Sequence, residues 1–477
     1  MRSIKDNYLR LYHKIIYLEG YPALSYGLIL ACAIFLAFGH YWALIPLIFF
    51  SKKNYKVLLL IILAFAFVKI YYQFPASPST GTAHFSVHSV SSAFRGSYLY
   101  RGTLKSFTPD NEEKSIASHL PCQIYSRKRL PANCDYHIHG SLTSRNGRNY
   151  QLKTKESWTP IPNTFSLAEN RFQLKAQFSR YLKKQIHSKR AHLFLSGLAT
   201  GELADRTLFK SFGNLGISHI MAFSGFHFAI LACLFHLLFR AFLPHKVSAI
   251  ALLLLLTSYF LFIGNGPSIQ RAWIMAFVYL FGQLFEKQTS GLNNLGVALC
   301  LALVLNPLSL FSLGLQLSFV ATLGILLLYG PLNTLLQMLI PKEKLSDIIE
   351  KSSLYQHFYL LGSFFRSSLA LTLAVHLAIF PILIFVFHTF QFHSLVYNLF
   401  FPFLASLSLI MLILALFFPP LHRLNGWYTD GILSIVDHPP IPLRTWYIEN
   451  VSLAFVTFYL MILFAMTLYL KRDEIID

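Results

Sequence analysis

Long apolar runs constrain this chain most, because they recur along nearly its whole length. A membrane-spanning helix needs about 17 or more mostly apolar residues, and most of the runs have about this length. Only 13% of the residues are charged, against roughly 25% in soluble domains. We therefore expect a polytopic α-helical membrane protein with about 10–11 transmembrane helices. The runs are 22–39, 41–50, 57–72, 217–239, 247–264, 268–285, 291–306, 311–330, 366–388, 393–418 and 451–470.

Two of the early runs need separate interpretation. The run 41–50 is too short to span a bilayer as a helix, so we expect a half-helix or a tight hairpin return. No signal-peptide cleavage site follows the run 22–39, so we expect it to remain as a membrane anchor.

Basic and neutral loops alternate between the runs. Basic loops lie in the cytoplasm under the positive-inside rule, and assigning all of them there is self-consistent. Met1 is then cytoplasmic, and the polar insert from Gln73 to Arg190 is external. The basic loop residues are Lys52, Lys53, Lys56, Arg240, Lys246, Lys287, Lys342, Lys344, Lys351, Arg423 and Arg444.

The polar insert begins with an expected β domain. Alternating apolar and polar residues, as in His84–Val90, are typical of half-buried strands. Asn146 and Gly147 suit a hairpin turn. Five short strands predict a small barrel. The strands are His84–Val90, Ser97–Phe107, Gln123–Ser126, Tyr136–Leu142 and Asn149–Lys153. We divide the chain into 1–72 (N-terminal transmembrane helices), 73–160 (external β domain), 161–215 (basic amphipathic helical linker) and 216–477 (main helical domain).

The insert is strongly basic. From Gln73 to Arg190 it has 18 Lys and Arg residues and 6 Asp and Glu residues, a net charge of +12. Cations interleaved with aromatic rings favour single-stranded nucleic acid, because the cations pair with phosphates and the rings stack on bases. The alternative is a barrel core of aromatic residues under a solvated charged face. The candidate DNA-binding residues are Arg95, Arg101, Lys105, Arg127, Lys128, Arg129, Arg145 and Arg148.

Cysteine and histidine patterns lead to two further expectations. Cys122 and Cys134 lie in an external, oxidising location at a spacing that allows closure across a strand pair, so we expect a disulfide. His137 and His139 resemble half of a zinc site, but Ser141 and Leu142 follow where a complete His-x-His-x-Asp-His pattern needs other residues. We interpret them as two strand histidines, and we expect neither a metal nor another cofactor.

An amphipathic helix is predicted from Phe165 to His187. Its apolar residues recur every four positions, and such a helix lies in the membrane interface or along the mouth of the bundle. The apolar set is Leu174, Phe178, Leu182 and Ile186, and the opposing basic set is Lys175, Arg180, Lys183 and Lys184.

Polar residues at membrane depth form a motif at the start of the main helical domain. They cost free energy unless a cavity or a partner satisfies them. The motif resembles the Gly-x-x-His-x-x-Ala-x-Ser-Gly-x-His signature of the ComEC competence family. If one helix opens at Gly216, His219 and His227 share a face. The matching residues are Gly216, His219, Ala222, Ser224, Gly225 and His227.

Later segments carry the same resemblance. They are Pro267–Ala272, Pro307–Leu310, Gly314–Phe319, and Pro381 with His388 and Asn398. The resemblance implies an external OB-fold and, in 216–477, a channel that passes single-stranded DNA into the cytoplasm across the bacterial inner membrane. The implied path residues are Ser218, His219, Ser224, Gly225, His227, Arg271, Gln316, Ser318 and Asn398.

Some of the path residues have alternative roles. Gln316 and Ser318 are also suited to hydrogen bonds between helices. Arg271 can bind a phosphate in the lumen or cap backbone carbonyls, and the sequence leaves both open. Acidic residues are nearly absent from the helical runs, which favours a polyanion pathway over a cation-coupled carrier.

Partners and alternative functions complete the expectations. Many ComEC family members carry a metallo-β-lactamase-like domain after the last helix, whereas this chain ends at Asp477; we therefore expect no enzyme activity and a separate nuclease where one is needed. Without a phosphate-loop motif, a separate motor ATPase is expected, together with a DNA receptor and membrane lipids. The alternatives are a carrier or flippase for lipids or small metabolites, and an intramembrane hydrolase using Ser224 and His227.

Overall fold

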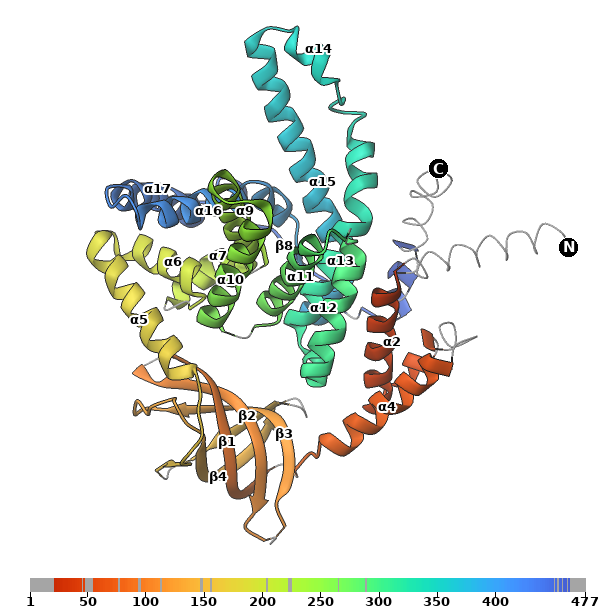
Figure 1. The fold of residues 1–477 in the computed structure, drawn as a ribbon, viewed down its shortest axis with the longest axis vertical. Helices are drawn as coiled ribbons and strands as arrows, with labels where there is room; N and C mark the ends of the chain where they lie inside the picture. Colours follow the sequence, from red (N-terminus) through yellow and green to blue (C-terminus); the bar gives the residue numbers. More distant parts are fainter. Residues whose placement is uncertain are drawn as a thin grey trace, which may run out of the picture.

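The computed structural model describes most of the chain. It covers residues 21–463 apart from 45, 48–54, 76–77, 93–95, 112–113, 146–148, 155–156, 203–204, 222–224, 265, 288–289, 450, 453, 457 and 461. A small β-barrel lies on one side of a helical bundle, and a helical hairpin projects from the other side (Figure 1).

The polar insert folds as a closed five-stranded barrel. The strand order is β1-β2-β3-β5-β4, and antiparallel pairing of β4 with β1 closes the sheet. The β3–β5 pair is parallel, and the remaining neighbours are antiparallel. This closure confirms the predicted barrel, which fits an OB-like fold. The strands are β1 Ser79–Ser92, β2 Tyr98–Pro109, β3 Ile116–Ser126, β4 Tyr136–Arg145 and β5 Asn149–Lys153, with the short β6 Thr159–Pro160 beside β4.

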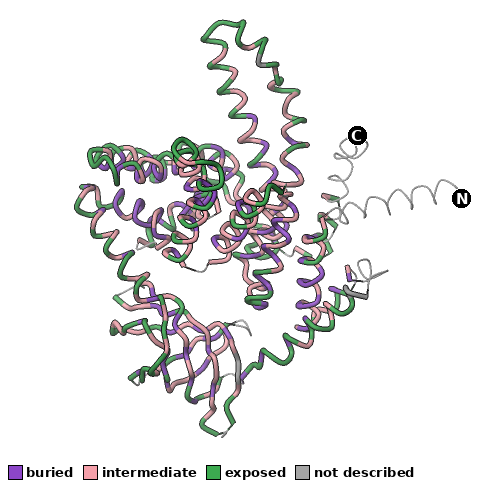
Figure 2. Tube along the Cα trace, in the orientation of Figure 1, coloured by how far each residue is buried: buried purple, intermediate pink, exposed green. Residues whose placement is uncertain are grey.

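Alternation along the strands fills the barrel. Phe85, Tyr100, Leu104 and Phe107 are each fully buried, and Figure 2 shows buried residues along the strands of the barrel. Successive strand residues point to opposite faces. The aromatic residues Tyr100 and Phe107 are therefore core residues, as the structural alternative for this domain predicted.

The expected disulfide is not formed. Cys122 and Cys134 are both free thiols. Cys122 lies in β3, and Cys134 lies in the turn that leads into β4, but β5 separates these two strands on one side of the barrel. Strands that flank an intervening strand are about 9–10 Å apart, which exceeds the Cα separation of a disulfide. The disulfide was expected across a pair of neighbouring strands, but β3 and β4 are not neighbours in this barrel.

The helical part confirms the polytopic membrane fold. Five helices among the described residues are long and apolar enough to cross a membrane: α9, α10, α13, α15 and α16. Shorter apolar helices are α2, Leu58–Tyr71 within α4, and α12. The helices run α2 Pro22–Ala37, α4 Tyr55–Tyr71, α9 Gly225–Phe242, α10 His245–Ile263, α11 Pro267–Leu284, α12 Gly291–Leu305, α13 Leu313–Leu336, α14 Leu345–Ile349, α15 Ser353–Phe387, α16 His393–Ala415 and α17 Leu421–Asp437. Helix α17 was not expected.

Two of the expected helical runs are described only in part. The run 41–50 contains the 3₁₀ turn η2 Tyr41–Ala43, and residues 48–50 lie outside the described residues. Within the expected helix 217–239, the structure describes the short α8 Ser218–Met221 and α9, which is described from Gly225. Gly216 has φ +73°, a left-handed conformation that glycine adopts readily and that ends a right-handed helix. The shared face of His219 and His227 stays a prediction, because residues 222–224 lie outside the described residues.

Glycines allow close packing of α2 against α12. A Cβ on Gly296 would lie 2.1 Å from the backbone nitrogen of Leu24, and a Cβ on Gly27 would lie 3.2 Å from the carbonyl oxygen of Gly296. Small residues let helix backbones approach closely. This contact joins the N-terminal helices to the main helical domain.

Helix α5 (Ala168–Gln185) joins the barrel to the bundle. It contacts β1, α10 and α6 (Lys189–Thr200). Its apolar face differs from the expected one: Leu174 is 51% exposed, whereas Lys175 is only 9% exposed. Leu182 and Ile186 are buried as expected. The chain enters the barrel from α4 and leaves it into α5, so the barrel is connected to the bundle at both ends (Figure 1).

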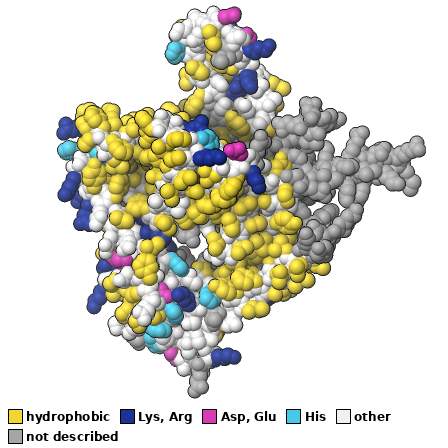
Figure 3. All heavy atoms as spheres, viewed as in Figure 1, with side chains coloured by type: hydrophobic (Ala, Val, Ile, Leu, Met, Phe, Trp, Pro, Cys, Tyr) yellow, Lys and Arg dark blue, Asp and Glu magenta, His cyan; other side chains and the backbone are white. Residues whose placement is uncertain are grey.

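The hairpin of α13 and α15 projects on the side opposite the barrel (Figure 1). Helix α15 has 35 residues, and at 1.5 Å per residue it is about 52 Å long. This exceeds the roughly 30 Å hydrocarbon thickness of a bilayer. Figure 3 shows hydrophobic side chains over much of the bundle, and Lys and Arg side chains at the hairpin tip and around the barrel.

Candidate functional site

A glycine turn and the start of α16 form the first polar cluster of the bundle. His393 Nε2 lies 2.8 Å from the carbonyl oxygen of Asn214, and Gln391 Nε2 donates to the carbonyl oxygen of Gly213 at 3.3 Å. A Cβ on Gly216 would lie 2.4 Å from the Ser394 Cβ. The start of the family motif is thus held against α16, and only glycine fits at 216.

Two histidines lie at this cluster. His219 in α8 is exposed, and its imidazole is close enough to that of His376 in α15 for their charges to interact. His376 Nδ1 lies 2.9 Å from the carbonyl oxygen of Thr372, and its Nε2 lies 3.4 Å from Ser394 Oγ. His376, Gln391 and Ser394 were missed in the sequence, because only the packing of α15 and α16 brings them to His219. Ser218, beside His219, is partly exposed.

Arg271 forms a second cluster. Its Nη1 donates to the carbonyl oxygen of Ser318 at 3.1 Å, whereas its buried Nε has no hydrogen-bond partner among the described residues. A Cβ on Gly225 would lie 2.6 Å from Arg271 Nη2. Glycine at the start of α9 therefore makes room for the guanidinium, which remains only partly satisfied. The bond to Ser318 supports the backbone-capping role, and the free Nε leaves capacity for an anion.

The remaining predicted path residues have different surroundings. Gln316 Nε2 donates to the carbonyl oxygen of Leu310 at 3.0 Å, as expected for a helix-packing role. His227 is 2% exposed and points into the protein. Asn398, one turn after Ser394 on α16, has a buried Oδ1 without a partner among the described residues. Ser224 lies outside the described residues.

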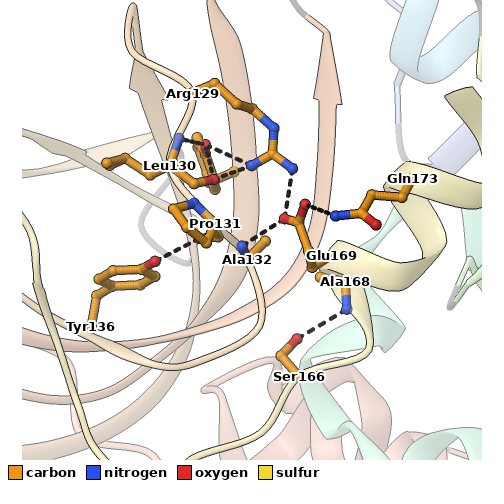
Figure 4. A network of polar contacts seen from close by, with 10 residues as sticks. Arg129, Leu130, Pro131, Ala132, Tyr136, Ser166, Ala168, Glu169 and Gln173 are labelled. Carbon is orange, nitrogen blue, oxygen red and sulfur yellow. Dashed lines mark hydrogen bonds and ion pairs between the residues drawn. The ribbon is translucent and has the colours of Figure 1, made fainter.

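Two predicted DNA-binding cations of the barrel are used within the protein. Arg129 Nη2 donates to Glu169 Oε2 at 2.6 Å, and its guanidinium lies 4.4 Å from the Phe172 ring centre. Figure 4 shows Arg129 reaching Glu169 of α5 from the segment before β4. Desolvation opposes ionisation of Glu169, but its bonds to Arg129 and other donors lower its pKa. Arg129 thus fixes the barrel on α5.

Lys105 is the second of these cations. Its Nζ pairs with Asp135 at 2.8 Å, and His84 Nε2 lies 3.1 Å from the same carboxylate. Asp135 is 2% exposed. Desolvation opposes ionisation, and hydrogen bonds from Lys105 and others more than offset it, so the pKa of Asp135 is lowered. Lys105 therefore neutralises a buried carboxylate.

The other predicted barrel cations divide into three groups. Arg127 and Lys128 are exposed in the turn after β3. Arg101 is exposed on β2 and lines a cavity. Arg95 and Arg148 lie outside the described residues, as does the side chain of Arg145.

His137 and His139, which resemble half of a zinc site, lie on β4. His137 is exposed, and His139 Nε2 lies 3.1 Å from Asp110 Oδ1. In the described part of the chain, no group of three or more His, Cys, Asp and Glu side chains is placed to hold a metal ion.

A cavity of ≈ 650 Å³ lies between the barrel and the bundle. Its walls come from β1, β2, α5, α6 and the turn between α10 and α11. Arg101, Arg171, Lys175 and Glu202 line it. The sequence predicted Lys175 in the basic set opposite the apolar face of α5. The cavity was missed because its walls are far apart in the chain.

The fold and the site define a polytopic helical membrane protein with an extramembrane OB-like barrel and buried polar clusters. Residues 198–473 match the sequence profile of the family described as "Competence protein". This is more than half of the chain, and the chain belongs to that family.

Two relatives align with part of the chain. It is 35% identical over 118 residues to "ComE operon protein 3" of Bacillus subtilis (strain 168), which covers 24% of this chain and 15% of that protein. It is 31% identical over 145 residues to "Uncharacterized protein MG316 homolog" of Mycoplasma pneumoniae, covering 30% of this chain and 34% of the relative. No solved structure matches.

Proposed function

We propose that this protein takes part in DNA uptake for competence, as a channel that passes single-stranded DNA across the bacterial inner membrane into the cytoplasm. The barrel receives the strand, and the helical bundle passes it. The observation that carries this proposal is the pair of polar clusters around His219 and Arg271, which include family-motif residues and lie among apolar helices. Membership of the competence family supports it.

The direction of passage follows from the two sides of the bundle. Lys342, Lys344 and Lys351 lie at the α14 end of the hairpin, and the barrel lies at the other side (Figure 1). With the basic tip in the cytoplasm, the barrel is external and meets DNA first. Separate proteins supply the receptor, the motor ATPase and, where needed, a nuclease; the chain itself acts as a channel and not as an enzyme.

The decisive experiment measures DNA import and strand binding together. A deletion strain should lose internalised DNA, and the purified full chain in nanodiscs should bind fluorescent oligothymidylate. Because each neutralised phosphate releases counterions, log affinity should fall against log salt with a slope of roughly 0.7 per phosphate contacted. Import that persists in the deletion strain would contradict the channel role. If the deletion strain still imports DNA but loses transport of a lipid or a small metabolite, the carrier or flippase alternative would be favoured.

Cysteine labelling should test the topology. Burial raises the pKa of the Cys122 thiol to about 12, and the thiolate is the reactive form. Cys134 is partly exposed. An impermeant maleimide should therefore label Cys134, and not Cys122, in cells with an intact inner membrane and a permeabilised outer one. Labelling of the wild type should need no prior reduction, because Cys134 is a free thiol. Cys134→Ser should abolish the signal. Labelling that requires inner-membrane permeabilisation would place the barrel in the cytoplasm.

A further inference from the structure

The cavity between the barrel and the bundle is positively charged. Arg101, Arg171 and Lys175 face one carboxylate, Glu202, which leaves two uncompensated positive charges. The volume of ≈ 650 Å³ lies within the range of about 300–1,000 Å³ that is usual for small-ligand sites. A cavity of this size and charge suits an anionic group such as a phosphodiester.

Two of its cations also bind the end of α10. Lys175 Nζ donates to the carbonyl oxygen of Ile263 at 2.8 Å, and Arg171 Nε donates to that of Leu261 at 2.6 Å. These residues are four apart on α5, so they share a face. The contacts aim both side chains at the α10–α11 turn, which ends five residues before Arg271.

The second polar contact of Lys175 is with Glu202. Lys175 Nζ lies 3.3 Å from Glu202 Oε1, and the two side chains are 10% and 30% exposed. Burial raises the pKa of Glu202 and lowers that of Lys175, although each partner opposes the shift of the other. Keeping both side chains charged in this cavity therefore costs desolvation free energy. An incoming anion can take the place of the Glu202 carboxylate beside Lys175.

Arg101 supplies a cation on the barrel side. It belongs to β2, is exposed, and lines the cavity. Its charge is close enough to Glu202 to stabilise the carboxylate. The cavity thus runs from an exposed barrel cation to two cations of α5.

We propose that this cavity is a phosphate-binding vestibule for the incoming strand, in which Glu202 occupies the position of a phosphate on Lys175 until DNA replaces it. The proposal rests on the proposed function and adds a site and a displacement step to it. Glu202 then sets how readily a strand passes from the barrel to the bundle, because each phosphate competes with an attached carboxylate.

A purely structural role for the pair predicts a different outcome. If Lys175 and Glu202 only fasten α5 to the bundle, removing the carboxylate lowers stability and leaves DNA affinity unchanged. If Glu202 competes with phosphate, Glu202→Gln strengthens binding. A gain in affinity is not a result that misfolding produces.

The test measures oligothymidylate binding to the full chain in phosphatidylcholine nanodiscs. Glu202→Gln should tighten binding by about fivefold or more, in the range of typical coupling between sites. Lys175→Met should weaken binding, and it should reduce the gain from Glu202→Gln in the double variant, because the two residues are coupled. Glu286→Gln is the matched control, since Glu286 pairs with Lys246 at 3.2 Å on an exposed surface; its affinity should equal that of the wild type.

The outcomes separate this proposal from the broader one. If the wild type binds and Glu202→Gln matches Glu286→Gln, the vestibule is wrong and the channel role stands. If the wild type does not bind at low salt and cells import DNA without the protein, the proposed function itself fails. If Glu202→Gln increases retention of phosphatidylglycerol and not of oligothymidylate, the ligand is a lipid headgroup and the vestibule proposal is overturned.

Discussion

Arg271→Gln is expected to reduce DNA import strongly while the protein still inserts in the membrane. The guanidinium holds the Ser318 carbonyl with Nη1 and keeps Nε without a partner among the described residues. Loss of a hydrogen bond to a charged group costs about 1.5–3 kcal/mol, equivalent to roughly 10- to 150-fold in binding. Import of labelled DNA per molecule of membrane-inserted protein is the measurement.

Arg366→Gln is the control for this prediction. Arg366 is a buried arginine that binds the carbonyl oxygen of Ile340 at 2.6 Å, Asn333 Oδ1 at 3.2 Å and Ser363 Oγ at 3.3 Å within the projecting hairpin. Arg366→Gln should lower the melting temperature of the protein and have a smaller effect on DNA import per molecule of membrane-inserted protein. Arg271→Lys should keep part of the import, because it keeps the charge and loses the planar fork. Equal import by Arg271→Gln and the wild type would assign Arg271 to helix capping alone.

Gly296→Leu is expected to separate α2 from α12 and to destabilise the protein by more than about 3 kcal/mol. The Cβ alone would lie 2.1–2.4 Å from backbone atoms of Ala23 and Leu24. Backbone cannot rotate away as a side chain can, so the helices must move apart. The melting temperature of the detergent-purified protein and its yield in membranes would report the loss.

Gly330→Leu provides the matched substitution. Gly330 is also a helical glycine, in α13, but a Cβ there would meet nothing within 4 Å. This variant should keep the melting temperature of the wild type, because the leucine reaches open space. Similar melting temperatures for the two variants would show that α2 and α12 tolerate a wider separation than their glycines suggest.

The barrel strands could be predicted because alternation is a local property. His84–Val90 and Tyr136–Leu142 lie inside β1 and β4, and their hydrophobic pattern follows the two-residue repeat of a half-buried strand. Pairing is not local. The sequence does not say that β5 inserts between β3 and β4, and the disulfide expected between Cys122 and Cys134 was wrong for that reason.

The site was only partly predictable for a related reason. Arg271 was recognised by its motif, and the structure surrounds it with Gly225 and Ser318 from other helices. Lys175 was assigned to the basic side of α5 because the apolar residues of this helix recur every four positions on another face. Its burial depends on α10, nearly 90 residues away, and no periodicity along α5 contains that information.

The two connections of the barrel have a kinetic consequence. Because α4 leads into β1 and β6 leads into α5, and because Arg129 fastens the barrel to Glu169, the barrel cannot tumble relative to the bundle. A strand bound to the barrel is then presented to the bundle at an effective concentration that, for short linkers, reaches the millimolar range. Capture of a strand end becomes an intramolecular step, whose rate depends on this fixed geometry and not on how much DNA surrounds the cell.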